Sequence, residues 1–172
     1  MVATGALTVL FGSKETSDFW ADGLMRWWEG VKGGLGHIRR LVVYLDNGPN
    51  NSGTRTQWLK RVVEFADATG LEVRLVYYPP YHSKYNPVER CWSALEQKWG
   101  GGLLTCLEVI LAYARRMRWK GQPPTVGVLG GEYADGVRLS KAQMKPIEAR
   151  LERSTTLPKY DITIRPKTPR DG

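Results

Sequence analysis

Apolar residues in the first part of the chain switch between the spacing of strands and the spacing of helices. Residues 6–12 (ALTVLFG) form a short apolar run rich in strand-forming residues, which predicts a first strand. A helix is then predicted from Ser17, which can act as its N-cap, to about Lys32, where Gly33 and Gly34 end it. Its apolar residues recur at helical spacing and form one stripe, made of Trp20, Leu24, Trp27, Trp28 and Val31.

The same alternation of strand and helix is repeated twice more. The run 40–45 (RLVVYL) predicts a central strand of a parallel sheet, because such strands are buried on both faces. A helix is predicted over 54–69, where Gly70 stops it, and a third strand over 71–78 (LEVRLVYY). A third helix is predicted over 86–99, after an Asn-Pro start. This order of elements predicts an α/β fold with a mostly parallel sheet.

The pattern becomes looser after residue 103. Helices are predicted over 104–118 and 140–153, and the segment between them is rich in Gly and Pro. The last dozen residues, which end in RPKTPRDG, are typical of a tail. We therefore expect residues 1–103 to form the main α/β unit, and residues 104–172 to form a small helical extension with a basic tail.

Composition changes this picture mainly through charge. The formal net charge is +8, which favours polyanionic partners, with DNA first among them. The Lys and Arg residues are spread along the sequence, so charge permits DNA binding without establishing it. The two Cys and two His residues lack the spacing of zinc ligands. No apolar run is long enough to cross a bilayer and no basic leader precedes one, so a cytoplasmic protein without a membrane partner is expected.

Two carboxylates, Asp46 and Glu89, occupy positions at which catalytic or metal-binding residues are expected. Asp46 directly follows the strand 40–45, and ligands of open α/β sheets gather at the carboxyl ends of strands. Taken alone, Asp46 could equally start a turn with Asn47 and Gly48. Glu89 falls in the first turn of the helix 86–99, where it could form a capping box or serve as a hard metal ligand.

The sequence around Glu89 carries a resemblance to a known family. The segment 78–90 (YPPYHSKYNPVER) resembles the signature of mariner-like DDE transposases, in which Pro-Pro, Ser and Asn-Pro precede a catalytic Glu. In that family an Asp that ends an apolar strand is the second carboxylate, as in LVVYLDNGP here. The separation of Asp46 from Glu89 and the motifs WKG, YADGV and DITI are more similar to the ISAzo-type branch of insertion sequences.

The resemblance implies an RNase H-like (retroviral-integrase-like) core and metal-dependent cleavage and transfer of DNA strands. Asp46 and Glu89 would hold two Mg²⁺ or Mn²⁺ ions, since these ions prefer oxygen ligands and a two-metal site suits in-line displacement at phosphorus. His82, Lys84 and Arg90 flank the motif and could contact DNA phosphates, or could be solvated loop charges. The Asn residues at 47, 50 and 51 are typical of turns, and the alternative is a supporting role behind the metal ligands.

The first Asp of the DDE triad has no match in the sequence. It should end the first strand of the fold, but Asp18 and Asp22, which alone precede Asp46, fall on a predicted helix. The resemblance therefore implies an RNase H-like core that lacks its first two strands, within an N-terminally truncated transposase associated with the nucleoid. The loss would leave an edge of the strand 40–45 unpaired and favour self-association, unless residues 6–12 pair with it.

Three functions remain open at this point. The chain could be a fragment that is inactive alone because one of three metal ligands is absent. It could be a non-catalytic regulator that binds DNA or associates with full-length transposase. It could also be completed by an upstream reading frame that supplies the missing Asp.

Overall fold

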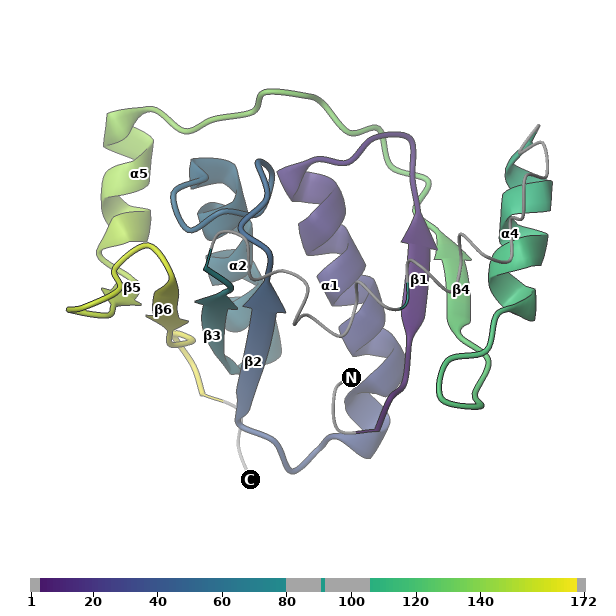
Figure 1. The fold of residues 1–172 in the computed structure, drawn as a ribbon. Helices are drawn as coiled ribbons and strands as arrows, with labels where there is room; N and C mark the ends of the chain where they lie inside the picture. The colour runs from purple at the N-terminus through teal and green to yellow at the C-terminus, as the bar shows by residue number, and fades with distance from the viewer. Residues whose placement is uncertain (1–3, 80–90, 92–105, 170–172) are drawn as a thin grey trace.

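The computed structural model describes residues 4–79, 91 and 106–169, which fold into helices and two sheets (Figure 1). The first part contains β1 (Thr8–Phe11), α1 (Ser17–Val31), the short 3₁₀ helix η1 (Lys32–Gly34), β2 (Arg40–Leu45), α2 (Thr56–Thr69) and β3 (Glu72–Tyr77). The second part contains α4 (Leu107–Arg116), β4 (Thr125–Val128), α5 (Lys141–Glu148), β5 (Leu151–Arg153) and β6 (Asp161–Ile164).

The larger sheet has the strand order β2-β3-β6-β5. β2 and β3 run parallel, in a register that pairs Arg40 with Glu72 and Leu45 with Tyr77. β6 joins β3 antiparallel, and β5 joins β6 antiparallel. One face of this sheet packs against α1 and α2. The core between the sheet and these helices is built from apolar side chains of both, including Leu75, Ile162 and Trp58. The predicted α/β class is therefore confirmed, with a mixed sheet rather than a mostly parallel one.

The smaller sheet consists of β1 and β4, paired in parallel. α1 lies between the two sheets (Figure 1), and a Cβ atom at Gly23 would lie 3.4 Å from Leu10 of β1. The alternative that residues 6–12 pair with the strand 40–45 is therefore wrong, because β1 pairs with β4. Among the described residues β2 pairs with β3 alone, and its outer face exposes Val42 at 38% and Tyr44 at 51%.

The helix boundaries follow local chemistry. α1 is capped by Thr16, whose Oγ1 accepts a hydrogen bond from the Phe19 N–H at 3.2 Å, so the predicted N-cap at Ser17 is one residue late. α2 ends as predicted at Gly70, which adopts the left-handed conformation with φ of 70° and donates its N–H to the carbonyl of Ala66. The predicted helix 86–99 lies outside the described residues except for Cys91, which is helical and buried.

The part of the chain after residue 106 differs most from the prediction of a helical extension. The helix predicted over 140–153 is limited to α5 (Lys141–Glu148), and the residues after it form β5. The DITI segment, which was expected to belong to the tail, is the strand β6. Ile162 and Ile164 are fully buried against the core, and that burial draws β6 into the sheet beside β3. The boundary expected between residues 103 and 104 lies outside the described residues and stays a prediction.

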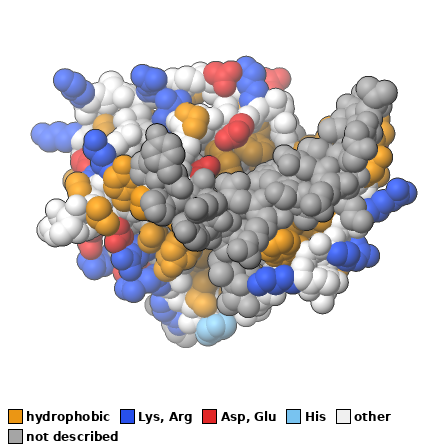
Figure 2. Space-filling model, viewed as in Figure 1, with side chains coloured by type: hydrophobic (Ala, Val, Ile, Leu, Met, Phe, Trp, Pro, Cys, Tyr) orange, Lys and Arg blue, Asp and Glu red, His pale blue; other side chains and the backbone are white. Residues whose placement is uncertain are grey.

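No helix among the described residues is long and apolar enough to span a bilayer. On the face seen in Figure 2, Lys and Arg side chains lie around the periphery, in keeping with their spread along the sequence.

Asp67 of α2 ties the C-terminal segment to the core. Its carboxylate accepts hydrogen bonds from Arg150 Nη1 at 3.1 Å and Nη2 at 2.8 Å, and from the Lys167 N–H at 2.8 Å. Arg150 Nη2 also donates to the carbonyl of Arg165 at 2.6 Å. The hydrogen bonds from Arg150 lower the pKa of Asp67 below its usual value.

Because the folded-state pKa of Asp67 is lowered, its contribution to stability is present at neutral pH and is lost as the pH falls below about 4, through the depressed value. We predict that Asp67→Asn lowers the free energy of unfolding at pH 7 by about 1–3 kcal/mol. The difference from wild type should shrink in acid, as measured by urea unfolding at several pH values. The control is Asp135→Asn, which breaks an exposed pair with Lys14 and should change little. An equal loss for Asp67→Asn at every pH would contradict the prediction.

Candidate functional site

Asp46 lies at the carboxyl edge of the larger sheet, directly after β2. β3 ends at the same edge, because the two strands are parallel, and the Tyr78 N–H continues the ladder by donating to the carbonyl of Leu45 at 2.8 Å. The chain leaves β3 here and enters the segment that contains the Glu89 motif. His82, Lys84, Glu89 and Arg90 themselves lie outside the described residues, so their predicted roles stay predictions.

The Asp46 carboxylate is exposed and also organises a turn. Its Oδ1 atom accepts hydrogen bonds from the Gly48 N–H at 3.3 Å and from Asn51 Nδ2 at 3.2 Å. Asn47 between them adopts a left-handed φ of 63°, a conformation that Asn tolerates better than most residues. The turn-forming interpretation of Asp46 is thus confirmed. The hydrogen bonds from Gly48 and Asn51 both end on Oδ1 of Asp46, so this turn leaves Oδ2 available to a ligand.

Asn51 is the most buried polar side chain of this loop, with only 2% of its surface exposed. Its Nδ2 holds Asp46, while its Oδ1 is buried and has no hydrogen-bond partner among the described residues. The sequence indicates a turn from the density of Asn, but nothing in it tells which amide is turned inward. A carboxylate and an amide oxygen are the kinds of atom that a hard divalent cation prefers.

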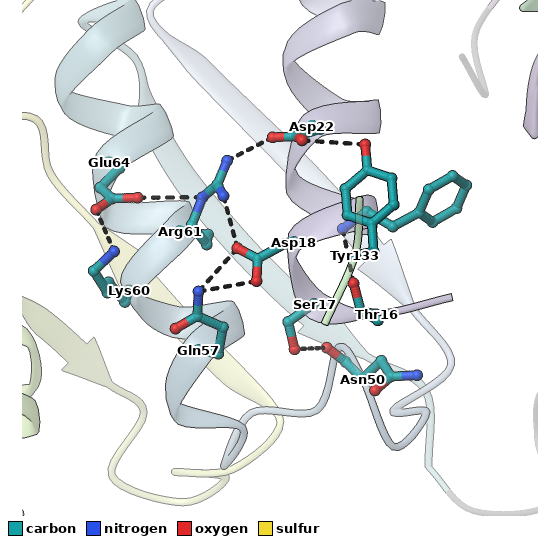
Figure 3. A network of polar contacts seen from close by, with 11 residues as sticks. Thr16, Ser17, Asp18, Asp22, Asn50, Gln57, Lys60, Arg61, Glu64 and Tyr133 are labelled. Carbon is teal, nitrogen blue, oxygen red and sulfur yellow. Dashed lines mark hydrogen bonds and ion pairs between the residues drawn. The ribbon is translucent and has the colours of Figure 1, made fainter. Parts of the chain in front are cut away.

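The loop is also held from two sides by distant parts of the chain. Just before α1, the carbonyl of Glu15 accepts a hydrogen bond from Asn50 Nδ2 at 2.8 Å. At the first residue of α1, Ser17 Oγ donates to the carbonyl of Asn50 at 2.6 Å (Figure 3). At the connection between β5 and β6, Arg153 Nη1 donates to the carbonyl of Gly53 at 3.0 Å. These contacts fix the loop that carries Asp46 on the body of the molecule.

Asp18 and Asp22 are committed to a contact between α1 and α2 (Figure 3). Arg61 of α2 donates to Asp18 Oδ1 at 2.7 Å and to Asp22 Oδ1 at 2.6 Å. Gln57 also donates to both Asp18 oxygens, and the Tyr133 hydroxyl donates to Asp22 at 3.2 Å. Burial, followed by the nearby Asp22 carboxylate, raises the pKa of Tyr133. Both acids lie on a helix as expected, and their hydrogen bonds give them a structural role.

The described residues do not hold a complete metal site by themselves. Within 4–79, 91 and 106–169, no group of three or more His, Cys, Asp and Glu side chains could hold a metal ion. The exposed carboxylate of Asp46 is the kind of donor that a hard cation binds, and further ligands would have to come from elsewhere, with Glu89 as the predicted source.

Gly53 allows the loop to press against the β5–β6 connection. A Cβ atom at this position would lie 2.1 Å from the carbonyl oxygen of Lys159, so one of the two segments would have to move. We predict that Gly53→Ala lowers the free energy of unfolding by about 1–3 kcal/mol, measured by urea unfolding.

The matched control is Gly30→Ala on α1, where the new methyl group would meet nothing within 4 Å. Alanine favours the helix over glycine, so this variant should be as stable as wild type or more stable. Equal stability of Gly53→Ala and wild type would show that the close approach at Lys159 is not a constraint.

Comparison with known families supplies the remaining evidence. The family model described as the Rhodopirellula transposase DDE domain matches residues 2–166, a span that runs from before β1 to beyond β6 and includes both Asp46 and Glu89. No curated protein and no solved structure matches the chain. The resemblance found in the sequence is confirmed at the level of the DDE superfamily, while a mariner-like origin and a truncation remain expectations. Since the match covers nearly all of its residues, the chain belongs to the family of the Rhodopirellula transposase DDE domain.

Proposed function

We propose that this chain contributes the second and third carboxylates, Asp46 and Glu89, to a DDE transposase site that cleaves and joins DNA strands. The observation that carries the proposal is the position of Asp46 at the carboxyl end of β2, at the sheet edge where β3 leads into the Glu89 motif. Family membership supports the reaction type, and a transposase implies DNA as partner.

The chain's own residues would act by binding and orienting. Asp46 is held by Gly48 and Asn51 through one oxygen, so its carboxylate meets a cation in a fixed orientation. Glu89 would complete the ligand set from the segment after β3. Bound Mg²⁺ or Mn²⁺ supplies the charge that activates the attacking oxygen and stabilises the leaving oxygen of a phosphodiester. His82, Lys84 and Arg90 would hold the DNA phosphates beside them.

We further propose that the 172 residues do not cleave DNA by themselves. A third carboxylate is needed, and the two Asp residues before Asp46 are engaged by Arg61 between α1 and α2. The missing ligand would come from additional coding sequence upstream or from a full-length transposase.

We expect no Mg²⁺- or Mn²⁺-dependent nicking of supercoiled plasmid DNA by the chain above the background of its Glu89→Ala and Asp46→Ala variants. The conversion of supercoiled to open-circular DNA is the readout. Nicking by wild type that disappears in Glu89→Ala would show that the site is complete, and would overturn the proposal that this chain is inactive alone. Nicking that persists equally in both variants would indicate a contaminating nuclease and no activity of this site.

A second candidate function is that of an oligomerising or DNA-binding regulator of a full-length transposase. It is favoured by the exposed apolar side chains Val42 and Tyr44 on β2, which among the described residues has β3 as its one paired neighbour, and by the net charge of +8. A strand with an open edge and apolar side chains is prone to pair with a second chain.

This candidate predicts self-association that increases with protein concentration in sedimentation velocity. Tyr44→Lys should weaken the association, because it places a charge on the exposed part of β2. Leu157→Lys is the matched control, since Leu157 is 53% exposed, similar to the 51% of Tyr44, but lies in the β5–β6 connection. A monomer at every concentration, or an equal effect of the two variants, would argue against an interface at β2.

A further inference from the structure

A dense group of positive charges lies where α4 ends. It consists of four exposed residues, Arg115, Arg116, Arg118 and Lys120, of which the first two belong to the last turn of the helix. Across residues 106–131 the sequence has no other Lys or Arg, and its one acidic residue lies in the first turn of α4, at the other end of the helix. The end of α4 therefore carries a local excess of positive charge.

No carboxylate in the described part of the chain neutralises these four cations. Elsewhere Arg side chains are held by acids, as Arg74 is by Asp161 and Arg150 by Asp67. Within 4–79, 91 and 106–169, none of the ion pairs includes a cation of this group. On the face seen in Figure 2, Lys and Arg side chains lie at the lower right, and no described Asp or Glu side chain is visible beside them.

The helix itself accounts for part of this charge. Cations in the last turn of a helix are stabilised by its dipole, which favours Arg115 and Arg116. Arg118 Nη1 donates to the carbonyl of Met117 at 3.0 Å and so satisfies a carbonyl at the end of the helix. Lys120 lies beyond the helix and gains neither benefit, so its presence needs another explanation.

Lys120 also occupies a backbone position that disfavours lysine. Trp119 and Gln122 are joined by two backbone hydrogen bonds of 2.9 Å, with Lys120 and Gly121 between them as a two-residue turn. Lys120 has a φ of 47° and Gly121 a φ of 80°. Turns with two positive φ values favour Asn-Gly, and a residue with a long side chain is strained there. The chain therefore keeps a cation at this turn at a cost to its backbone.

The segment that carries the cations is fixed on the body of the molecule. Met117 is only 1% exposed and packs in a small core with Ala114 and Cys91. A Cβ atom at Gly5 would lie 2.7 Å from Cδ of Lys120, so the stem of this side chain lies against the segment that precedes β1. Side chains that are already held in place lose little conformational entropy when a ligand binds them. Fixed and exposed cations at close spacing suit a polyanion.

We propose that Arg115, Arg116 and Lys120 bind the phosphate backbone of duplex DNA outside the cleavage site. DNA carries about one negative charge per 1.7 Å of its axis, so closely spaced cations meet several phosphates without reading the bases. In Figure 1 the connection between α4 and β4 lies at the lower end of the smaller sheet, whereas β2 leads upward to Asp46. The contact therefore holds DNA away from the phosphate that is cleaved. This inference rests on the proposed function in taking DNA as the partner.

The test is the affinity of the full chain for a fluorescent DNA duplex, measured by anisotropy in EDTA over a series of NaCl concentrations. Arg115→Gln combined with Arg116→Gln removes two of the cations and should weaken binding roughly 10-fold or more at low salt. The slope of log affinity against log salt should fall by about 1 for each phosphate contact that is lost. A purely structural role of these residues would leave that slope unchanged.

Lys120→Asn separates DNA binding from folding. Asn suits the positive φ of this position better than Lys, so the thermal stability of the variant should equal or exceed that of wild type. Its affinity for the duplex should nevertheless fall, with a salt slope lower by about 1.

The matched control is Lys141→Gln combined with Lys145→Gln. Both lysines are exposed on α5, and neither has an ion pair among the described residues. This control changes the net charge by the same amount as the double variant at Arg115 and Arg116. It should bind the duplex nearly as wild type does.

Wild-type affinity and slope in the variants at 115, 116 and 120 would overturn the inference, as would a wild-type chain that does not bind the duplex. An equal loss in the α5 control would also overturn it, because binding would then follow net charge. If poly-glutamate at the same charge concentration displaced the duplex as well as unlabelled DNA does, the surface would fit an acidic protein instead. None of these outcomes affects the roles of Asp46 and Glu89, because EDTA removes divalent ions. Failure of the proposed function would appear in the plasmid-nicking experiment.

Discussion

The parallel pairing of β2 with β3 is the constraint on which the rest of the molecule depends. Parallel strands bring their carboxyl ends to one edge, so Asp46 lies beside the point where the chain leaves β3 toward the Glu89 motif. The inner side chains of these strands, among them Val73 and Leu75, are fully buried against the helices. Moving either strand by one residue would turn this apolar set outward, so the register of the core also sets the position of the site.

Local chemistry explains which parts of the fold could be predicted from the sequence. The run 40–45 and the helix ended by Gly70 are set by their own residues, and both lie close to where they were expected. The pairing of β1 with β4, and of β3 with β6, joins segments that are far apart along the chain. The strand Asp161–Ile164 alternates polar and apolar residues, but a run of four is too short to name its partner, which lies far away along the chain.

In the candidate site, too, the features set by neighbouring residues could be predicted, and those set by distant segments could not. The position of Asp46 at a strand end follows from the sequence, because a strand and the residue after it are neighbours in both chain and space. The burial of Asn51 does not follow, since the loop contains several Asn residues of equal turn-forming tendency, and the packing around them decides which one faces inward. In the same way Asp18 and Asp22 could be assigned to a helix, but their shared partner Arg61 comes from α2.

The two-sided attachment of the Asp46 loop has a consequence for the order in which the protein matures on the ribosome. The contacts to Glu15 and Ser17 can form early, since these residues are made before the loop itself. The contacts at Gly53 require Arg153 and Lys159, which are made about a hundred residues later. The strands β5 and β6, which complete the larger sheet, are made at the same late stage, so the Asp46 loop and the sheet acquire their final contacts together, after residues 153–164 have been synthesised.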